Sequence, residues 1–161
     1  MLARSRASAD TICAASLRHP RVPFIDAHAR TPYATLDGVQ VRIARQSAHL
    51  DAVVAFYRDG LGLPEIARFE DHDGYTGVML DLPGTSAHLE FTATEHIVRP
   101  LAHVEDLLVL YVGSRQEVDR LVAQSSASPV PSANPYWDRV GVTLSDPDGF
   151  RVVLVAGSWP D

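Results

Sequence analysis

Two segments in different halves of the chain share one pattern of apolar residues and turn residues, and this repeat constrains the fold most. The first covers 77–92 and turns through Pro83 and Gly84, and the second covers 141–155 and turns through 146–149. Two alternating apolar runs around such a turn are typical of a β-hairpin. A hairpin that occurs twice indicates a duplicated unit.

The repeat is inexact at the positions that could carry chemistry. When the two hairpins are aligned, Glu90 of the first falls on Val153 of the second, and His88 falls on Arg151. Residues two apart on a strand lie on the same face, so each pair shares one face of its sheet. We therefore expect a lopsided pocket, polar on the side of the first unit and more apolar on the other.

Composition excludes several classes of protein. The chain has 161 residues, 46% of them hydrophobic, which is enough to bury a core. Its formal net charge of -6 argues against a nucleic-acid or anionic-membrane partner. A single cysteine, Cys13, excludes an intrachain disulfide, and no apolar run approaches the roughly 20 residues that span a bilayer. We expect a soluble, cytoplasmic protein.

The chain divides into a leading extension and two modules. Residues 1–38 are rich in arginine, alanine, serine and proline, and we expect them to be partly disordered or to lie across the surface of the domain. The parts that follow are the first module (39–98), a connector (99–106), the second module (107–157) and a tail (158–161).

The first module is predicted to have the order βαβββ. Alternation predicts that strand 39–44 turns one face to a packed layer, and helical spacing with Ser47 as N-cap predicts the helix. The predicted elements are strands at 39–44, 66–70, 75–80 and 87–92 and a helix at 50–57.

The second module is predicted to repeat that order. Strand 107–112 is apolar throughout, which predicts burial on both faces. Ser114 and Glu117 form a capping box at the start of its helix. A short strand is expected near 129–131, an awkward place because proline cannot donate to a ladder. The closing hairpin is predicted at 139–145 and 150–155, with Tyr136 and Trp137 in the loop before it.

Three motifs in this order carry a family resemblance: the helix end at 56–64, the strand end at 88–91 and the turn and strand at 146–154. Together they resemble the vicinal oxygen chelate superfamily, which includes glyoxalase I, extradiol dioxygenases, fosfomycin-resistance proteins and bleomycin-resistance proteins. The resemblance covers about 39–157. It implies an α+β fold in which two βαβββ modules form a curved mixed sheet around a cavity, often completed in a homodimer.

The resemblance also implies where a divalent metal ion would bind. In the family's enzymes, each module holds the metal through a residue near the start of its first strand and a Glu on its last strand. These positions fall on Arg42 and Glu90 in the first module and on Leu107 and Val153 in the second. Arg42, Leu107 and Val153 lack an atom that binds a metal ion, and Arg42 also carries a positive charge. We expect no cofactor; a divalent ion, if bound, would be held by Glu90 and His88.

Other residues complete the expected pocket. Arg42 is expected to form an ion pair with Glu90 where the metal would lie, and this pair could also orient a ligand. Arg151 adds a second cationic group. Tyr136 and Trp137 are candidates for the pocket wall, although Trp137 could instead plug the interface between the modules. The candidate ligand-binding residues are Arg42, His88, Glu90, Tyr136, Trp137 and Arg151.

Three functions remain open on this basis. The first is a metal-free protein that binds a small organic molecule or drug, similar to the bleomycin-resistance proteins. The second is a lyase, isomerase or dioxygenase that uses a metal through unrecognised ligands. The third is a metal-free acid–base enzyme in which Glu90 and His88 are catalytic and Arg42 steadies charge. The expected partners are a small-molecule ligand and a second copy of the chain.

Overall fold

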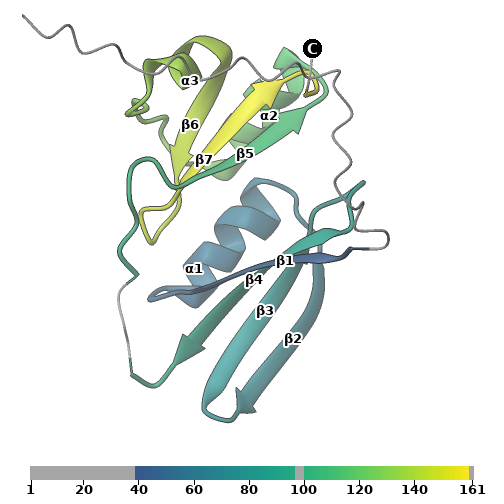
Figure 1. Cartoon of the computed structure of the whole chain (residues 1–161), viewed down its shortest axis with the longest axis vertical. Coiled ribbons are helices and arrows are strands. Elements are labelled where there is room, and N and C mark those ends of the chain that lie inside the picture. Colours follow the sequence, from purple (N-terminus) through teal and green to yellow (C-terminus); the bar gives the residue numbers. More distant parts are fainter. Residues whose placement is uncertain (1–38, 97–99, 160–161) are drawn as a thin grey trace, which may run out of the picture. The chain divides into compact units, whose positions relative to one another are not determined.

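A four-stranded mixed sheet forms the first module. The computed structural model describes residues 39–96 and 100–159, so the expectations for the 1–38 extension, including Cys13, and for the last two residues of the tail fall outside the described part. The strand order is β1-β4-β3-β2, in which β1 is parallel to β4 and the other pairs are antiparallel (Figure 1). The strands are β1 (Val41–Gln46), β2 (Glu65–His72), β3 (Tyr75–Asp81) and β4 (Ala87–Thr94).

Helix α1 (Leu50–Ala55) and the π-helical turn η1 (Phe56–Gly60) lie on one face of this sheet. Their buried residues pack with alternate residues of β3 and β4 in one apolar core: Val53, Val54, Phe56, Tyr57, Val78, Leu80, Leu89 and Phe91. The expected N-cap, Ser47, lies two residues early. His49 occupies the cap position, and the Ser47 hydroxyl accepts a hydrogen bond from the His49 backbone N–H at 3.1 Å.

The second module contains a three-stranded sheet with the order β5-β7-β6. Its strands are β5 (Leu107–Val112), β6 (Gly141–Ser145) and β7 (Arg151–Ala156), with β5 parallel to β7. Helix α2 (Arg115–Ser125) begins at Ser114, whose hydroxyl accepts from the Glu117 N–H at 3.2 Å, as the capping pattern predicts. The expected fold class, α+β with two modules of mixed sheet and helix, is confirmed.

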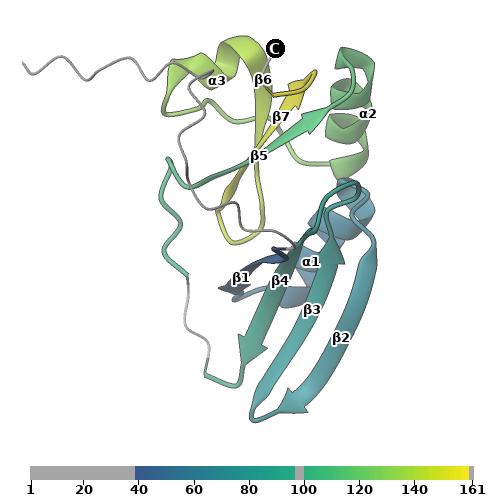
Figure 2. The same ribbon diagram turned by 45° about the vertical axis from the view of Figure 1, so that its right-hand side comes forward.

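One strand expected in the second module does not form, and a helix not expected there follows it in the chain. No strand forms near 129–131 in the described residues; Val130 N donates a single backbone hydrogen bond to Thr143 O at 2.9 Å, because the prolines on either side have no N–H. Tyr136 and Trp137 lie in helix α3 (Pro135–Val140) rather than in a loop, and β6 begins only at Gly141. Figure 2 shows α3 and α2 on opposite sides of this sheet.

The burial expected for the first strand of each module is wrong. β5 is half-buried rather than covered on both faces, with Tyr111 exposed. In β1, Val41 and Ile43 are 43% and 46% exposed instead of packed. Both strands lie at the edge of their sheet, so each has a strand neighbour on one side only.

The two modules meet where η1 packs against α2. A Cβ atom at Gly60 would lie 2.9 Å from the Cα of Ser125, so this contact requires a glycine. The described residues contain no helix that is both long and apolar enough to cross a membrane.

Candidate functional site

Arg42, His88 and Glu90 form a polar cluster on the face of the first sheet that α1 does not cover. Arg42 of β1 is the register partner of His88 of β4, and Glu90 follows two residues along the same strand. Nη1 of Arg42 lies 3.0 Å from Oε2 of Glu90, and Nε of Arg42 donates to Nε2 of His88 at 3.1 Å. The expected Arg42–Glu90 ion pair is therefore formed, and it includes His88.

These residues do not fit the metal site that the resemblance implies. The described residues contain no group of three or more His, Cys, Asp and Glu side chains that could hold a metal ion. Val153 is fully buried and apolar, and Leu107 is an apolar residue of a cavity wall. The Arg42 guanidinium is bound to the one carboxylate that remains at these positions. This donor set does not support metal chemistry.

A cavity of about 510 Å³ lies elsewhere, between residues of the two modules. Its walls are mainly apolar, and four charged side chains line it. The lining residues are Ile43, Arg45, Tyr57, Leu89 and Phe91 from the first module, Glu105 and Asp106 from the connector, and Leu107, Leu108, Phe150 and Arg151 from the second module. Of the six candidate residues, only Arg151 lies in this cavity.

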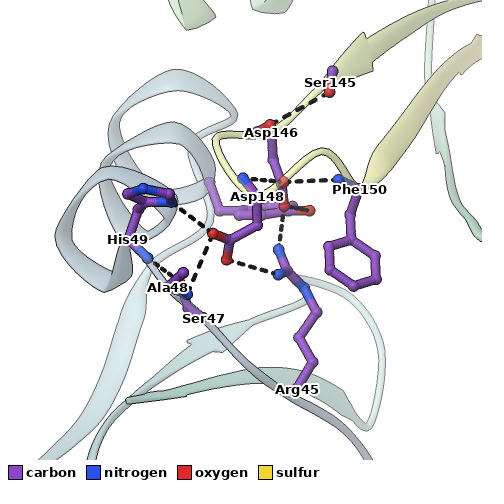
Figure 3. Close-up of polar contacts among 9 residues, drawn as sticks. Arg45, Ser47, Ala48, His49, Ser145, Asp146, Asp148 and Phe150 are labelled. Atoms are coloured by element: carbon purple, nitrogen blue, oxygen red, sulfur yellow. Dashed lines mark hydrogen bonds and ion pairs between the residues drawn. The ribbon is translucent and has the colours of Figure 1, made fainter. Parts of the chain in front are cut away.

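Arg45 belongs to a buried ionic cluster beside the cavity (Figure 3). Its side chain is 17% exposed and forms ion pairs with Asp146 and Asp148 in the turn between β6 and β7; both carboxylates are buried. The guanidinium also lies 4.7 Å from the ring centre of Phe91 and 4.1 Å from that of Phe150. One side chain thus joins β1 of the first module to the closing turn of the second.

Other groups satisfy the remaining oxygens of the cluster. Asp146 accepts from the Tyr57 hydroxyl at 3.0 Å and from the backbone N–H groups of Asp148 and Phe150. Oδ1 of Asp148 lies 2.9 Å from Nδ1 of His49 and accepts from the Ala48 N–H at 3.3 Å. Buried carboxylates with this many partners fix the position of a turn.

The environment shifts the pKa values of the cluster in different directions. Burial raises the pKa of Asp146 above the ordinary carboxyl range, although Arg45 acts in the opposite direction. Burial also raises the pKa of Asp148, but hydrogen bonds from Ser47 and His49 outweigh it, so that pKa lies below its usual value. Burial, with the nearby Asp146, raises the pKa of Tyr57 far above neutral, so Tyr57 stays a hydrogen-bond donor. The contacts are those of a structural clamp.

The family-level identity follows from comparison with known proteins. The YycE-like N-terminal domain family matches residues 41–92, and the YycE-like C-terminal domain family matches residues 105–156. The uncharacterized protein YycE of Bacillus subtilis (strain 168) is 40% identical over 127 residues, which cover 76% of this chain and 91% of YycE. The chain belongs to the YycE-like family.

Solved structures show that this YycE-like chain has the fold of the vicinal oxygen chelate superfamily. A crystal structure of B. subtilis YycE, a protein of unknown function, is 41% identical with a TM-score of 0.70, covering 76% of this chain and 93% of that one. The fosfomycin resistance protein FosX of Mesorhizobium loti has a TM-score of 0.57 at 10% identity, over 78% and 95% of the chains. Lactoylglutathione lyase of Agrobacterium tumefaciens has a TM-score of 0.52 at 19% identity, and the match covers 79% of this chain and 100% of that one. At these identities, the last two comparisons support the fold alone.

Two of the three remaining candidate residues of the YycE-like chain lie apart from the cavity. Tyr136 and Trp137 contact each other on α3 with ring centres 5.0 Å apart, and neither lines the cavity. Arg151 does line it, and its Nη1 donates to the Pro131 carbonyl at 2.6 Å. The structure therefore divides the six residues between the Arg42 cluster, helix α3 and the cavity.

Arg45 is the principal residue that sequence reasoning missed. Strand alternation places it on the same face as Val41 and Ile43, and a charged residue at an apolar position indicates a buried partner. Its partners, Asp146 and Asp148, belong to a motif that indicates a hairpin turn and carries the family resemblance, but neither interpretation assigns these carboxylates an ionic partner. Nothing local in the sequence indicated that this turn contacts the end of β1.

Proposed function

We propose that this YycE-like protein binds a small organic molecule, without a metal ion, in the cavity between its modules. The cavity carries the proposal. Its volume of about 510 Å³ lies within the range of roughly 300–1,000 Å³ that is usual for ligand sites, and apolar walls with few polar groups are typical of such sites. The non-ligand residues at the family's metal positions support binding without a metal.

One of the four charged side chains that line the cavity, Arg151, offers a site for an acidic group of a ligand, whereas Glu105 and Asp106 make the connector side of the cavity acidic. The positive charge of Arg45 is already matched by Asp146 and Asp148. Arg151 has no carboxylate partner within 4.0 Å in the part of the chain that the structure describes, so its guanidinium can form an ion pair with a carboxylate of a ligand. A flat apolar body against the wall formed by Leu107 and Leu108, with a carboxylate directed at Arg151, fits this arrangement.

Thermal-shift measurements with a panel of aromatic and aliphatic carboxylic acids, each paired with its neutral amide, test this function. We expect 1-naphthoate or a similar acid to raise the melting temperature in EDTA, because a ligand at 100 times its Kd stabilises by about 2.7 kcal/mol. Ile43→Trp should fill the cavity and abolish the shift. Ile66→Trp, an exposed site on β2 away from the cavity, should preserve it. No stabilisation by any acid, or equal shifts in Ile43→Trp, would refute the proposal.

A metal-free acid–base enzyme is the second candidate. The observation that favours it is the shared position of His88 and Glu90 beside the Arg42 guanidinium. Turnover of a panel compound in EDTA that is lost in Glu90→Gln would support this function. A metal-dependent lyase, isomerase or dioxygenase is disfavoured because three of the four expected positions lack a ligand atom.

We also propose that the protein acts in the cytoplasm as a homodimer. β1 is an edge strand, and the apolar side chains of Val39, Val41 and Ile43 are exposed along it. An exposed apolar edge favours pairing with a second chain. Homodimers are also what the superfamily resemblance implies.

A further inference from the structure

Four polar side chains share one face of the first sheet around Arg42. The register places Arg42 of β1 beside His88 of β4, and His88 beside Asp81 of β3, in one row across the sheet. Partners in a ladder lie on the same face. Glu90 lies two residues along β4, so it shares that face with the row. Three of these four residues have side chains that bind metal ions, and the fourth is a cation.

Arg42 already occupies the position in which an ion would bind Glu90 and His88. Its Nη1 lies 3.0 Å from Oε2 of Glu90, and its Nε lies 3.1 Å from Nε2 of His88. The Glu90 side chain is only 10% exposed, whereas that of Arg42 is 54% exposed. A buried carboxylate is costly without a positive partner, and the Arg42 guanidinium is that partner for Glu90.

We propose that the Arg42 guanidinium is the built-in cation of this site and that, within the first module, it is the residue that excludes a divalent metal ion. This inference rests on the metal-free binding function proposed above and concerns the family's metal position in the first module, which lies on the sheet face opposite the cavity-lining residues of β1. Arg42 removes a ligand position, supplies a repelling charge and occupies the lone pairs of Glu90 and His88 that an ion would use. Its exposed N–H groups remain available to an oxygen of a ligand.

We therefore expect a single substitution, Arg42→His, to create a metal-binding site in the first module. Arg42→His places a second imidazole beside His88 and frees Glu90, which gives two nitrogen ligands and one carboxylate ligand. That donor set suits Zn²⁺ and Co²⁺. Arg42→Gln is the matched control, because it removes the charge without adding a strong ligand.

Calorimetric titration of untagged, EDTA-treated protein with ZnCl₂, and absorption spectra with CoCl₂, test the inference. We expect Arg42→His to bind one ion per chain at least about tenfold tighter than Arg42→Gln, a difference of about 1.4 kcal/mol. Wild type should bind no tighter than Arg42→Gln. The double variant Arg42→His/Glu90→Gln should lose the gain, which separates this site from histidines elsewhere on the surface.

Two outcomes would overturn the inference. One is a stoichiometric ion in wild type, held as tightly as in Arg42→His and lost in Glu90→Gln. The other is equal affinity of Arg42→His and Arg42→Gln, with both variants folded by circular dichroism. If Arg42→His fails to fold, Arg42→Glu offers the same comparison with a carboxylate ligand. No organic ligand enters these titrations, so an absence of naphthoate binding would refute the proposed function and leave this result unaffected.

Discussion

Two arginines three residues apart on β1 serve opposite faces of the same sheet. Arg42 is directed to Glu90 on the face that α1 leaves uncovered, and Arg45 is directed to Asp146 and Asp148 beside the cavity. Alternation along a strand separates them, because residues an odd number apart lie on opposite faces. A single edge strand therefore supplies the cation of the polar cluster and the clamp between the modules.

Replacing Arg45 should strongly destabilise the protein. Arg45→Met leaves two buried carboxylates without their cation, and breaking a buried ion pair in this way costs about 3–5 kcal/mol. The free energy of unfolding from urea titration measures the loss. The control Arg115→Met removes an exposed pair with Asp119 and should cost less than about 1 kcal/mol. The neutral triple variant Arg45→Met/Asp146→Asn/Asp148→Asn should be more stable than Arg45→Met alone; the opposite order would contradict the clamp.

Asp148 should make stability depend on acidity. Its pKa is lower in the folded protein than in the unfolded chain, where it is about 3.9. Its contribution is therefore present above about pH 4 and is lost as the pH falls through the folded value. The stability difference between wild type and Asp148→Asn, measured in urea from pH 7 to pH 3, should shrink below about pH 4. A difference that stays constant over this range would show that Asp148 gains nothing from its partners.

At the scale of elements, the close contact between η1 and α2 joins the modules. Gly60 allows it, because a Cβ there would lie 2.9 Å from a backbone atom of Ser125 that cannot move aside cheaply. The helices of the two modules would otherwise have to separate. This contact and the Arg45 clamp are independent links between the same two modules.

Gly60→Ala should destabilise the protein by about 1–3 kcal/mol, the usual cost of overpacking, although alanine is the better helix former. Thermal and urea unfolding measure the change. Gly113→Ala is the control, because a Cβ there meets no atom within 4 Å; it should change stability by less than about 0.5 kcal/mol. A neutral or stabilising Gly60→Ala would show that α2 can move away freely.

Local sequence signals predicted most of the helices and strands but not how far each of them is buried. Alternation and turn residues located β3, β4, β5 and β7, and the serine cap located α2. Helix α3 was missed because Pro135 was interpreted as part of a loop, although proline is well tolerated in the first turn of a helix and Asn134 caps it. The exposure of β1 and β5 depends on their place at the sheet edge, which is a long-range property.

The site was predictable only in part for the same reason. The Arg42–Glu90 pair could be predicted because the family resemblance implies that the first and last strands of a module lie close together. The Arg45 clamp joins residues about a hundred positions apart, Arg45 and Asp146 or Asp148, and no local pattern carries that information. The expected wall residues Tyr136 and Trp137 were placed on the assumption of a loop, and the helix that forms instead leaves them outside the cavity.

At the scale of the whole molecule, the exposed edge of β1 predicts a dimer. Val41→Lys places a charge on this edge and should convert the dimer to a monomer in light scattering. Ile66→Lys, on β2 at the other edge of the same sheet, should leave the dimer intact. A wild-type monomer at high micromolar concentration, or a dimer that survives Val41→Lys, would exclude β1 as the contact.

We propose that this YycE-like protein binds its ligand without a metal ion. Native mass spectrometry of untagged protein mixed with 1-naphthoate, before and after EDTA treatment, tests it most directly, because polypeptide, ion and ligand are weighed together. We predict the polypeptide with one bound acid per cavity and no divalent ion, unchanged by EDTA and lost in Ile43→Trp. One divalent ion per chain, absent from Glu90→Gln and required for the acid to bind, would contradict the account.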